Sequence, residues 1–231
     1  MELSKRLHAV ASLVTEGASV ADIGTDHGYV PIYLMKNKIA SKVIALDINQ
    51  GPLEHARMHI IGHGLKDKIE TRLSDGLKKV EPYEVDTMIA AGMGGALVIK
   101  ILTDSKKVVD SLECCILQPQ SEIDKVRRFL AANKLRIIEE DMVEEDGKFY
   151  PMMKVIHGEP EEYTEYEYIF GKKLIEDRHP VLKKFLLREK EIQESIMNQL
   201  AKRTGSESAK MRSREIYAQM QFTLQALEQF D

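Results

Sequence analysis

The stretch Ala21-Asp22-Ile23-Gly24-Thr25-Asp26-His27-Gly28-Tyr29 decides the fold of this chain. Apolar residues lead into it, and Asp47 ends the next apolar run along the sequence. In an open parallel sheet, glycines after the first strand let backbone amides approach a ligand closely, and an acid at the end of the second strand accepts hydrogen bonds from the hydroxyls of a ribose. The pattern therefore predicts a binding site for a nucleoside cofactor.

The loop lacks the second glycine of a dinucleotide-binding loop. Such loops place a second glycine two positions after the first, where a pyrophosphate packs against bare backbone. Asp26 holds that position here. A carboxylate repels a pyrophosphate, whereas it attracts a sulfonium and an α-ammonium group. The loop therefore favours S-adenosylmethionine, and a nicotinamide-dependent oxidoreductase is the disfavoured alternative.

Length and composition indicate a globular protein with one full domain and a smaller addition. The 231 residues are 43% hydrophobic and carry a net charge of -4, which argues against a uniformly basic surface but allows a local basic patch. Cys114 and Cys115 are adjacent in an apolar run, so we expect two buried thiols. The sequence has no signal-peptide pattern and no apolar stretch long enough to span a membrane, so we expect a cytoplasmic protein.

Apolar runs and helical patterns alternate through most of the chain. Residues 3–14 have the spacing of an amphipathic helix. Five continuous apolar runs predict buried parallel strands, and helices are expected between them. The strands are residues 19–22, 42–47, 69–74, 85–90 and 113–118, and the helices are residues 31–36, 51–62, 94–103 and 121–133. This βαβ order predicts a doubly wound α/β sheet.

The last part of the predicted sheet and the C-terminal segment differ from this pattern. Residues 135–142 and 149–156, joined by an acidic turn at 144–147, predict an antiparallel hairpin at one sheet edge, as in methyltransferase sheets. We therefore expect a Rossmann-like class I methyltransferase domain over residues 1–158. Residues 159–231 predict a helical hairpin or coiled-coil-like domain, whose first long helix begins at His179-Pro180 and which is interrupted at 204–208.

Ligands bind at the strand ends of such a sheet, so these positions supply the candidate cofactor residues. Asp47 is expected to bind the ribose hydroxyls, although a helix cap is the alternative. Asp75 is expected to accept a hydrogen bond from the adenine amino group, or to be a turn residue. Asp26 and His27 are expected to contact the methionine end, or to cap the following helix. The predicted cofactor-binding residues are Asp22, Gly24, Thr25, Asp26, His27, Gly28, Asp47, Ile48, Asn49, Asp75, Gly76, Ala91 and Gly92.

Three further segments contain residues suited to chemistry. The small residues of Ala91-Gly92-Met93-Gly94-Gly95 leave room for a planar base, or merely form a turn that opens a helix. Gln118-Pro119-Gln120 follow the fifth strand and either line the same cleft or serve as a loop. His55, His59 and His63 recur at helical spacing, but a solvated helix face is favoured over a metal site, and no metal is expected.

With these residues in place, the chain resembles the bacterial tRNA adenine-N1 methyltransferases that modify adenine 22 in the D-loop region. The resemblance rests on the residue 22–28 loop, Leu46-Asp47-Ile48-Asn49, Ala91-Gly92-Met93-Gly94-Gly95, Ile116-Leu117-Gln118-Pro119 and the helical C-terminal extension. It implies S-adenosylmethionine as methyl donor, S-adenosylhomocysteine as product, and a coiled-coil-like domain that helps to hold tRNA. Residues 178–214 contain ten Lys or Arg against four Glu, a charge that suits RNA phosphates or an exposed helical hairpin.

The chemistry of this reaction indicates what the site must do. Adenine N1 already carries a lone pair, so placement against the methyl group is the main task. The base must first be exposed, because N1 lies on its Watson–Crick edge. Asp26 is the candidate for stabilising the cationic methylated adenine. The predicted catalytic residues are Asp26, Gly92 and Met93, and the predicted substrate-binding residues are Arg6, Tyr29, Gly94, Gly95, Gln118, Pro119, Lys183, Lys184, Arg188, Lys202 and Arg203.

Alternatives to this function remain open from the sequence. One is a methyltransferase for a different RNA site, or a methyltransferase for a small molecule or a protein whose C-terminal helices serve only dimerisation. The other is a non-catalytic nucleotide-binding or RNA-binding protein. The sequence does not fix the oligomeric state, and it slightly favours a monomer.

Overall fold

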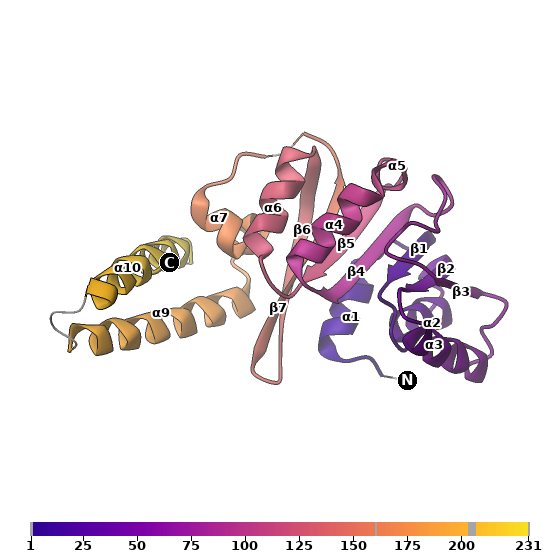
Figure 1. Cartoon of the computed structure of the whole chain (residues 1–231), viewed down its shortest axis with the longest axis horizontal. Helices are drawn as coiled ribbons and strands as arrows, with labels where there is room; N and C mark the ends of the chain where they lie inside the picture. The colour runs from indigo at the N-terminus through magenta and orange to yellow at the C-terminus, as the bar shows by residue number, and fades with distance from the viewer. Residues whose placement is uncertain (1, 160, 203–206, 231) are drawn as a thin grey trace. The chain divides into compact units, whose positions relative to one another are not determined.

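The computed structural model describes residues 2–159, 161–202 and 207–230. The chain divides into two compact units, Met1–Glu161 and Glu162–Asp231. Each unit has its own set of secondary-structure elements (Figure 1). The first unit holds the sheet and the strand-end loops, and the second is helical.

Among the described residues, seven strands form one sheet in the order β3-β2-β1-β4-β5-β7-β6 (Figure 1). The strands are β1 (Ala18–Ile23), β2 (Ala40–Asp47), β3 (Ile69–Leu73), β4 (Thr87–Met93), β5 (Cys114–Pro119), β6 (Leu135–Glu145) and β7 (Lys148–His157). β1 to β5 run parallel, whereas β7 is antiparallel to β5 and to β6. The predicted doubly wound α/β sheet with an antiparallel edge hairpin is therefore confirmed.

Helices cover both faces of the sheet and enclose two apolar cores. They are α1 (Lys5–Ser12), α2 (Tyr29–Lys36), α3 (Gln50–Gly62), α4 (Gly95–Asp104), α5 (Lys106–Val109) and α6 (Ile123–Ala132). The core on one face includes Val10, Ile32 and Ile60 from the first three helices. The core on the other face includes Val98 and Leu130 from α4 and α6. Side chains of β1 alternate between the two cores, because successive residues of a strand point to opposite faces.

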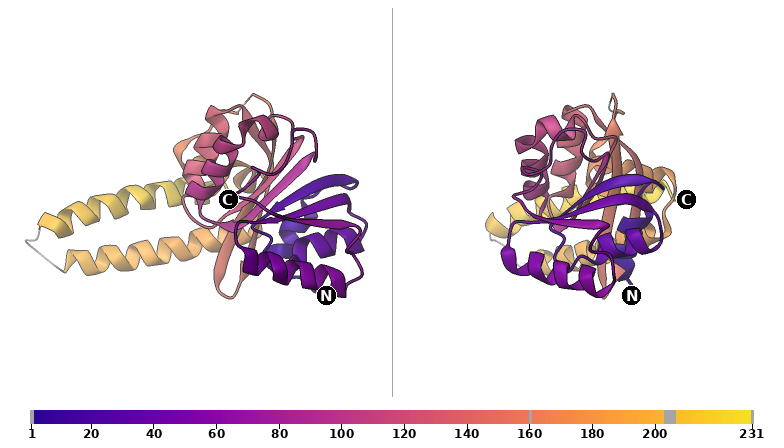
Figure 2. Two further views of the ribbon diagram at one scale, coloured as in Figure 1. Left: turned by 45° about the vertical axis from the view of Figure 1, so that its right-hand side comes forward. Right: turned by 90° about the vertical axis from the view of Figure 1, so that its right-hand side faces the viewer.

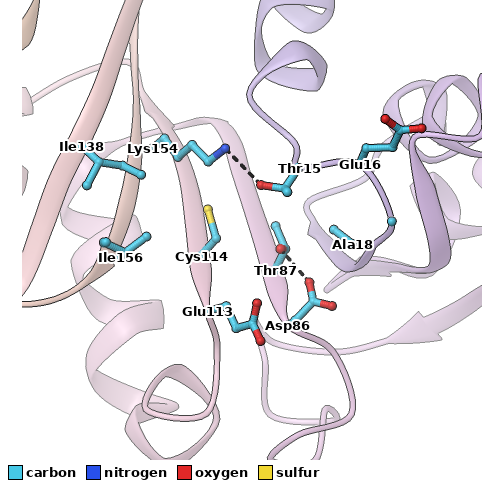
Figure 3. A pocket seen from close by; sticks show the side chains of 11 residues that line it. Thr15, Glu16, Ala18, Asp86, Thr87, Glu113, Cys114, Ile138, Lys154 and Ile156 are labelled. Carbon is cyan, nitrogen blue, oxygen red and sulfur yellow. Dashed lines mark hydrogen bonds between the residues drawn. The ribbon is translucent and has the colours of Figure 1, made fainter.

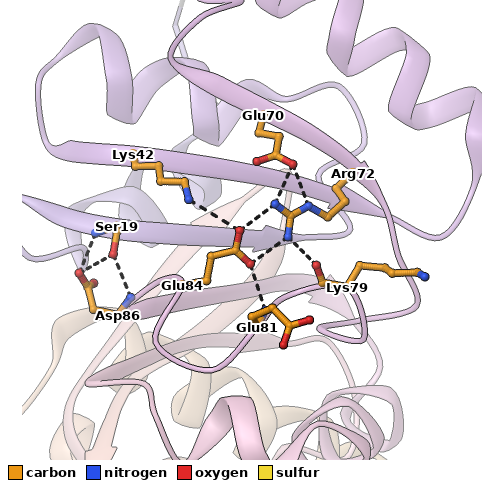
Figure 4. A network of polar contacts seen from close by, with 8 residues as sticks. All are labelled: Ser19, Lys42, Glu70, Arg72, Lys79, Glu81, Glu84 and Asp86. Atoms are coloured by element: carbon orange, nitrogen blue, oxygen red, sulfur yellow. Dashed lines mark hydrogen bonds and ion pairs between the residues drawn. The ribbon is translucent and has the colours of Figure 1, made fainter.

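The expectation that residues 69–74 form a buried strand is wrong in one respect. β3 is parallel to β2 as predicted, but it lies at the sheet edge, where Ile69 is buried and Glu70 and Leu73 are exposed. An ion-pair network covers this edge (Figure 4). Arg72 Nη2 lies 2.7 Å from Glu70 Oε1 and 2.8 Å from Glu84 Oε1. The hydrogen bond from Arg72 lowers the pKa of Glu84 to about 2.

The described residues of the second unit form two long helices and two short ones. They are α7 (Glu165–Phe170), α8 (Lys172–Glu176), α9 (Pro180–Ala201) and α10 (Glu207–Glu228). α9 begins at Pro180, as predicted, because proline suits the first helical position. α9 and α10 lie side by side (Figure 2) and bury Leu182 and Leu186 on one helix and Ile216 and Thr223 on the other. The predicted helical C-terminal region is therefore present. Across residues 2–159, 161–202 and 207–230, no helix has both the length and the apolar character needed to cross a lipid bilayer.

Candidate functional site

A cavity of about 200 Å³ lies at the carboxyl ends of β1 and β4. In the strand order, β1 has β2 on one side and β4 on the other, which makes this the switch point where open α/β sheets bind ligands. Its lining residues come from α1, from β1 and the loop after it, from the start of α2, from the end of β4 and from the residue after β5. They are Arg6, Leu7, Asp22, Gly24, Thr25, Asp26, His27, Tyr29, Val30, Ala91, Gly92 and Gln120.

A larger cavity, of about 440 Å³, lies at the amino ends of β1, β4 and β5 (Figure 3). Thr15, Asp86, Cys114 and Lys154 are among the residues that line it, and Lys154 Nζ donates a hydrogen bond to Thr15 Oγ1 over 3.1 Å. The strand ends that carry the loop glycines lie at the other end of the sheet. The smaller cavity is therefore the candidate functional site.

The loop after β1 is held in a left-handed conformation at three positions. The φ angles are 69° at Gly24, 51° at Asp26 and 72° at Gly28. The amides of Gly24 and Thr25 donate to Leu46 O over 2.8 and 3.0 Å, which fixes the loop against β2. A Cβ on Gly28 would lie 3.3 Å from Ala56 Cβ, so the loop also packs closely on α3. The glycines are thus required both by the backbone angles and by the approach of α3.

Asp47 links this loop to the loop after β2. Its side chain is buried, its Oδ1 accepts from Asn49 N over 2.9 Å, and its Oδ2 accepts from Asp26 N over 3.4 Å. Each carboxylate oxygen accepts about two hydrogen bonds, so both oxygens keep capacity for a ligand hydroxyl. The arrangement fits two neighbouring hydroxyls, as on a ribose.

Asp22 is a buried carboxyl group in the wall of the cavity. Only 5% of the residue is exposed. Burial raises the pKa of Asp22 to about 7, and the negative charge of Asp47 adds to this effect. A cationic ligand in the cavity would offset both causes and favour the ionised form. A buried acid with a raised pKa in a cleft is a mark of a functional site.

The opposite wall of the cavity is built by a contact between α1, β4 and β5. The side-chain oxygen of buried Gln118 accepts from Gly92 N over 3.1 Å and from Arg6 Nη1 over 3.0 Å. The guanidinium of Arg6 also lies 5.6 Å from the centre of the Tyr150 ring, within cation–π range. Gly92 has a φ of 82°, and a Cβ there would lie 3.2 Å from Arg6 Nη1. Arg6, Gly92 and Gln118 are therefore brought together at the site.

Met93 and Pro119 lie behind this wall. The two residues are paired in the register of β4 and β5, and Pro119 is buried. A Cβ on Gly24 would lie 3.3 Å from Met93 Cε, so the methionine side chain packs against the loop after β1. Both residues thus support the cavity from outside its lining.

Several residues predicted for the site have other partners in the structure. Asp75 forms an ion pair with Lys78, whose hydrogen bond lowers the pKa of the Asp75 carboxyl group. Gly76 packs against Ile101, with 3.1 Å between an added Cβ and Ile101 Cγ1. Ile48 is 60% exposed. These three residues lie outside the cavity lining, so their roles remain predictions.

The glycines that open α4 serve the packing of that helix. A Cβ on Gly95 would lie only 2.5 Å from Ser121 O, and Gly95 N donates to the same oxygen over 3.1 Å. Gly94 precedes the helix as its N-cap, and a Cβ there would lie 3.3 Å from Ser121 Oγ. The structure thus places both glycines against the loop before α6, next to the cavity wall but outside its lining.

The basic residues predicted to bind RNA lie in the second unit. Lys183, Lys184 and Arg188 are exposed on α9 and, with Leu187, are among the residues that line a surface groove of about 480 Å³. Lys202 follows α9 and is exposed. Arg203 lies outside the described residues.

Sequence reasoning missed three residues around the cavity. Leu7 and Val30 line it, but each has the spacing of an ordinary apolar helix residue, so no sequence signal separates it from the core. Tyr150 comes from β7, and its contact with Arg6 depends on the packing of α1 near the edge hairpin. Gln120, for which the sequence left cleft lining and a loop role open, lines the cavity.

The histidines of α3 have ring partners and a lysine neighbour. His55 and His59 stack against His27, and His63 Nδ1 lies 3.1 Å from Lys36 Nζ. Within the part of the chain that the structure describes, no group of three or more His, Cys, Asp or Glu side chains is placed to hold a metal ion.

Comparison with known proteins identifies the family. A family model described as a methyltransferase domain matches residues 3–153. A tRNA (adenine(22)-N(1))-methyltransferase from Bacillus subtilis (strain 168) is 32% identical over 235 residues, which cover 99% of this chain and 98% of that protein. TrmK from M. capricolum, solved with its cofactor product S-adenosylhomocysteine, is 26% identical with a TM-score of 0.86 over 100% of both chains.

A structure from Streptococcus pneumoniae, solved in complex with S-adenosyl-L-methionine, is also similar. It is 31% identical with a TM-score of 0.87, and the match covers 98% of this chain and 100% of that chain. The similarity thus extends over both units. The chain belongs to the family of tRNA (adenine(22)-N(1))-methyltransferases.

Proposed function

We propose that this protein transfers a methyl group from S-adenosylmethionine to N1 of adenine 22 in the D-loop region of tRNA. The observation that carries the proposal is the full-length similarity to a Bacillus subtilis enzyme named for this reaction. The similarity includes the helical second unit, which a methyltransferase for a small molecule does not need. The acidic cavity at the switch point of the sheet supports the same assignment.

The cavity suits a cationic nucleoside in three respects. Asp22 and Asp26 line it and supply negative charge for an α-ammonium and a sulfonium. Asp47 lies outside the lining, accepts from the Asp26 amide, and offers its two carboxylate oxygens to ribose hydroxyls. The left-handed glycines remove side chains where a ligand approaches the backbone. His27 Nδ1 is buried and has no hydrogen-bond partner among the residues that the structure describes, and His27 lines the cavity, so it is a further candidate to bind the ligand. When bound, S-adenosylmethionine supplies an electrophilic methyl group.

The residues on the other side of the cavity would receive the base. Ala91 and Gly92 have little or no side chain, which leaves space for a flat ring. Arg6 is held by Gln118 and Tyr150, so its guanidinium is fixed at the cavity and can orient the nucleotide. Tyr29 adds a ring to the lining of the cavity. Positioning of N1 is the main catalytic contribution, because N1 already has a lone pair.

Asp26 is proposed to stabilise the charge that methylation creates. Its side chain is 67% exposed, so it can reach a ligand in the cavity. A carboxylate near the N1/N6 edge would stabilise the cationic adenine and accept the N6 proton. Asp26 therefore acts after the base has entered, and its removal should affect turnover more than tRNA binding.

The second unit is proposed to bind tRNA phosphates through Lys183, Lys184, Arg188, Lys202 and Arg203. Lys183, Lys184 and Arg188 are exposed on α9, where their charge suits a polyanion, and phosphate contacts provide affinity without reading sequence. The proposal includes residues 1–158 as the catalytic domain, residues 159–231 as the tRNA-contacting domain, a cytoplasmic location and a monomeric working form.

Methyl transfer to defined tRNA transcripts tests the proposal. The purified full chain would be incubated with methyl-labelled S-adenosylmethionine and two transcripts that differ only in adenine or guanine at position 22. We expect label only in the adenine transcript, with 1-methyladenine at position 22 by mass spectrometry. Equal labelling of both transcripts would indicate another RNA site. The absence of label from both, with the cofactor still bound, would indicate a non-catalytic protein.

A further inference from the structure

Four rings form a parallel cluster beside the cavity, and we call it the ring cluster: His27, Tyr29, His55 and His59. The His27 ring centre lies 5.3 Å from that of Tyr29, 5.7 Å from that of His55 and 5.6 Å from that of His59. The corresponding angles between ring planes are 22°, 2° and 25°. Tyr29 and His59 are also stacked, at 5.7 Å and 14°. The four planes are therefore nearly parallel.

The local sequence explains why these rings meet. His55 and His59 are four positions apart on α3, so they lie on one face of the helix. Gly28 lets the loop after β1 approach Ala56, which lies between the two histidines in sequence. His59 Nδ1 lies 3.0 Å from His27 O, a distance at which an N–H there donates to the carbonyl oxygen. This contact fixes the loop and orients the rings.

The ring cluster is a surface feature and not part of the apolar core. Tyr29 is 38% exposed, the His27 side chain is 40% exposed, and His55 is exposed. His27 and Tyr29 line the cavity, whereas His55 and His59 lie on the neighbouring helix. The cluster thus extends from the wall of the cavity along α3. Nearly parallel rings that are exposed to solvent beside the cavity are suited to stack against another flat ring.

The proposed reaction supplies such a partner. An adenine can present N1 only after it leaves its stack, and the neighbouring bases then lose a stacking partner. Aromatic and imidazole rings stack on unpaired bases with little dependence on sequence. On the basis of the function proposed above, we propose that the ring cluster is a stacking surface for a nucleobase next to the methylated adenine. His55 is then a residue that positions the RNA.

Substitutions of His55 separate stacking from charge and from packing. His55→Ala removes the ring, His55→Phe keeps a ring without a proton-binding group, and His55→Lys keeps a cation without a ring. His63→Ala, at the end of the same helix and beside Lys36, is the matched control. We expect His55→Ala to raise the KM for tRNA about 5-fold or more, His55→Phe to restore it, and the dissociation constant of S-adenosylmethionine to stay unchanged. Restoration by His55→Lys, or an unchanged KM in His55→Ala, would overturn the proposal.

Abasic tRNAs identify the partner. Two transcripts would each lack one base beside adenine 22, on the 5′ or the 3′ side. If the stacked group is a neighbouring base, one of these transcripts should give the same KM with the wild-type protein and with His55→Ala. A difference that persists with both transcripts would overturn the proposal, as would loss of S-adenosylmethionine binding in His55→Ala. Failure of the wild-type protein to methylate the intact transcript would instead overturn the proposed function.

Discussion

At the scale of single residues, a buried carboxyl group makes stability depend on pH. The pKa of Asp22 is about 7 in the folded protein, above its ordinary value of 3.8, because of burial. A raised pKa means that the stability contributed by this group is complete below pH 4 and is lost as the pH rises through 7. Asp22→Asn does not titrate and avoids this loss. Relative to the wild type, its free energy of unfolding should rise between pH 4 and pH 8, by on the order of 4 kcal/mol.

Urea denaturation of both proteins across this pH range measures the difference. The same variant should bind S-adenosylmethionine more weakly at pH 8, because a neutral amide no longer attracts a cation. A stability difference that stays constant with pH would show that Asp22 is not protonated on folding. A more stable variant that binds less cofactor would identify Asp22 as a residue kept for binding.

Asp26 provides a second test at this scale. Asp26→Ala should lower kcat by about 10- to 100-fold with little change in tRNA affinity, because the carboxylate is proposed to act on the methylated base. Asp26→Asn is the companion variant, since asparagine tolerates the φ of 51° found here. If kcat and tRNA affinity fall together in Asp26→Asn, the carboxylate serves binding and not turnover.

At the scale of elements, the start of α4 depends on a glycine. A Cβ on Gly95 would come within 2.5 Å of Ser121 O, which belongs to the backbone and cannot simply rotate away. Gly95→Ala should therefore destabilise the protein by about 1–3 kcal/mol. Gly51→Ala is the matched control, because a Cβ on Gly51 in α3 would meet no described atom within 4 Å apart from its neighbours in sequence and its own helix backbone. Thermal unfolding measures both variants, and equal stability of the two would contradict this packing argument.

Elements were predictable from the sequence where the pattern is local. The strands that became β1, β2, β4 and β5 are continuous apolar runs, and Pro180 marks the start of α9. The exposure of β3 was not predictable, because it follows from its place at the sheet edge. The short helices α5, α7 and α8 are too brief to show a periodic pattern.

The candidate site was likewise predictable only where a local sequence pattern marks it. The loop of residues 22–29 and the end of β4 line the cavity because strand ends of a parallel sheet meet at one edge. The contact between Arg6, Gln118 and Tyr150 joins segments that are distant in sequence. The ring cluster likewise depends on the packing of two separate segments, the loop after β1 and α3. No sequence spacing encodes such contacts.

At the scale of the whole molecule, the first unit is proposed to transfer the methyl group and the second to supply affinity for tRNA. Combined replacement of Lys183, Lys184 and Arg188 by Glu should weaken tRNA binding at least 10-fold and lower its salt dependence, because phosphate contacts are lost. Binding of S-adenosylmethionine should not change. Replacement of the exposed Lys106 and Lys107 of α5 by Glu is the control. Equal loss of tRNA affinity in the control would indicate a general effect of charge.

Calorimetric titration of the whole protein tests the central claim most directly, namely that the acidic cavity at the ends of β1 and β4 binds a cationic methyl donor. We predict that S-adenosylmethionine and S-adenosylhomocysteine each bind at one site, and that a nicotinamide dinucleotide gives no heat of binding. Binding of the dinucleotide, with none of the methyl donor or its product, would contradict the account.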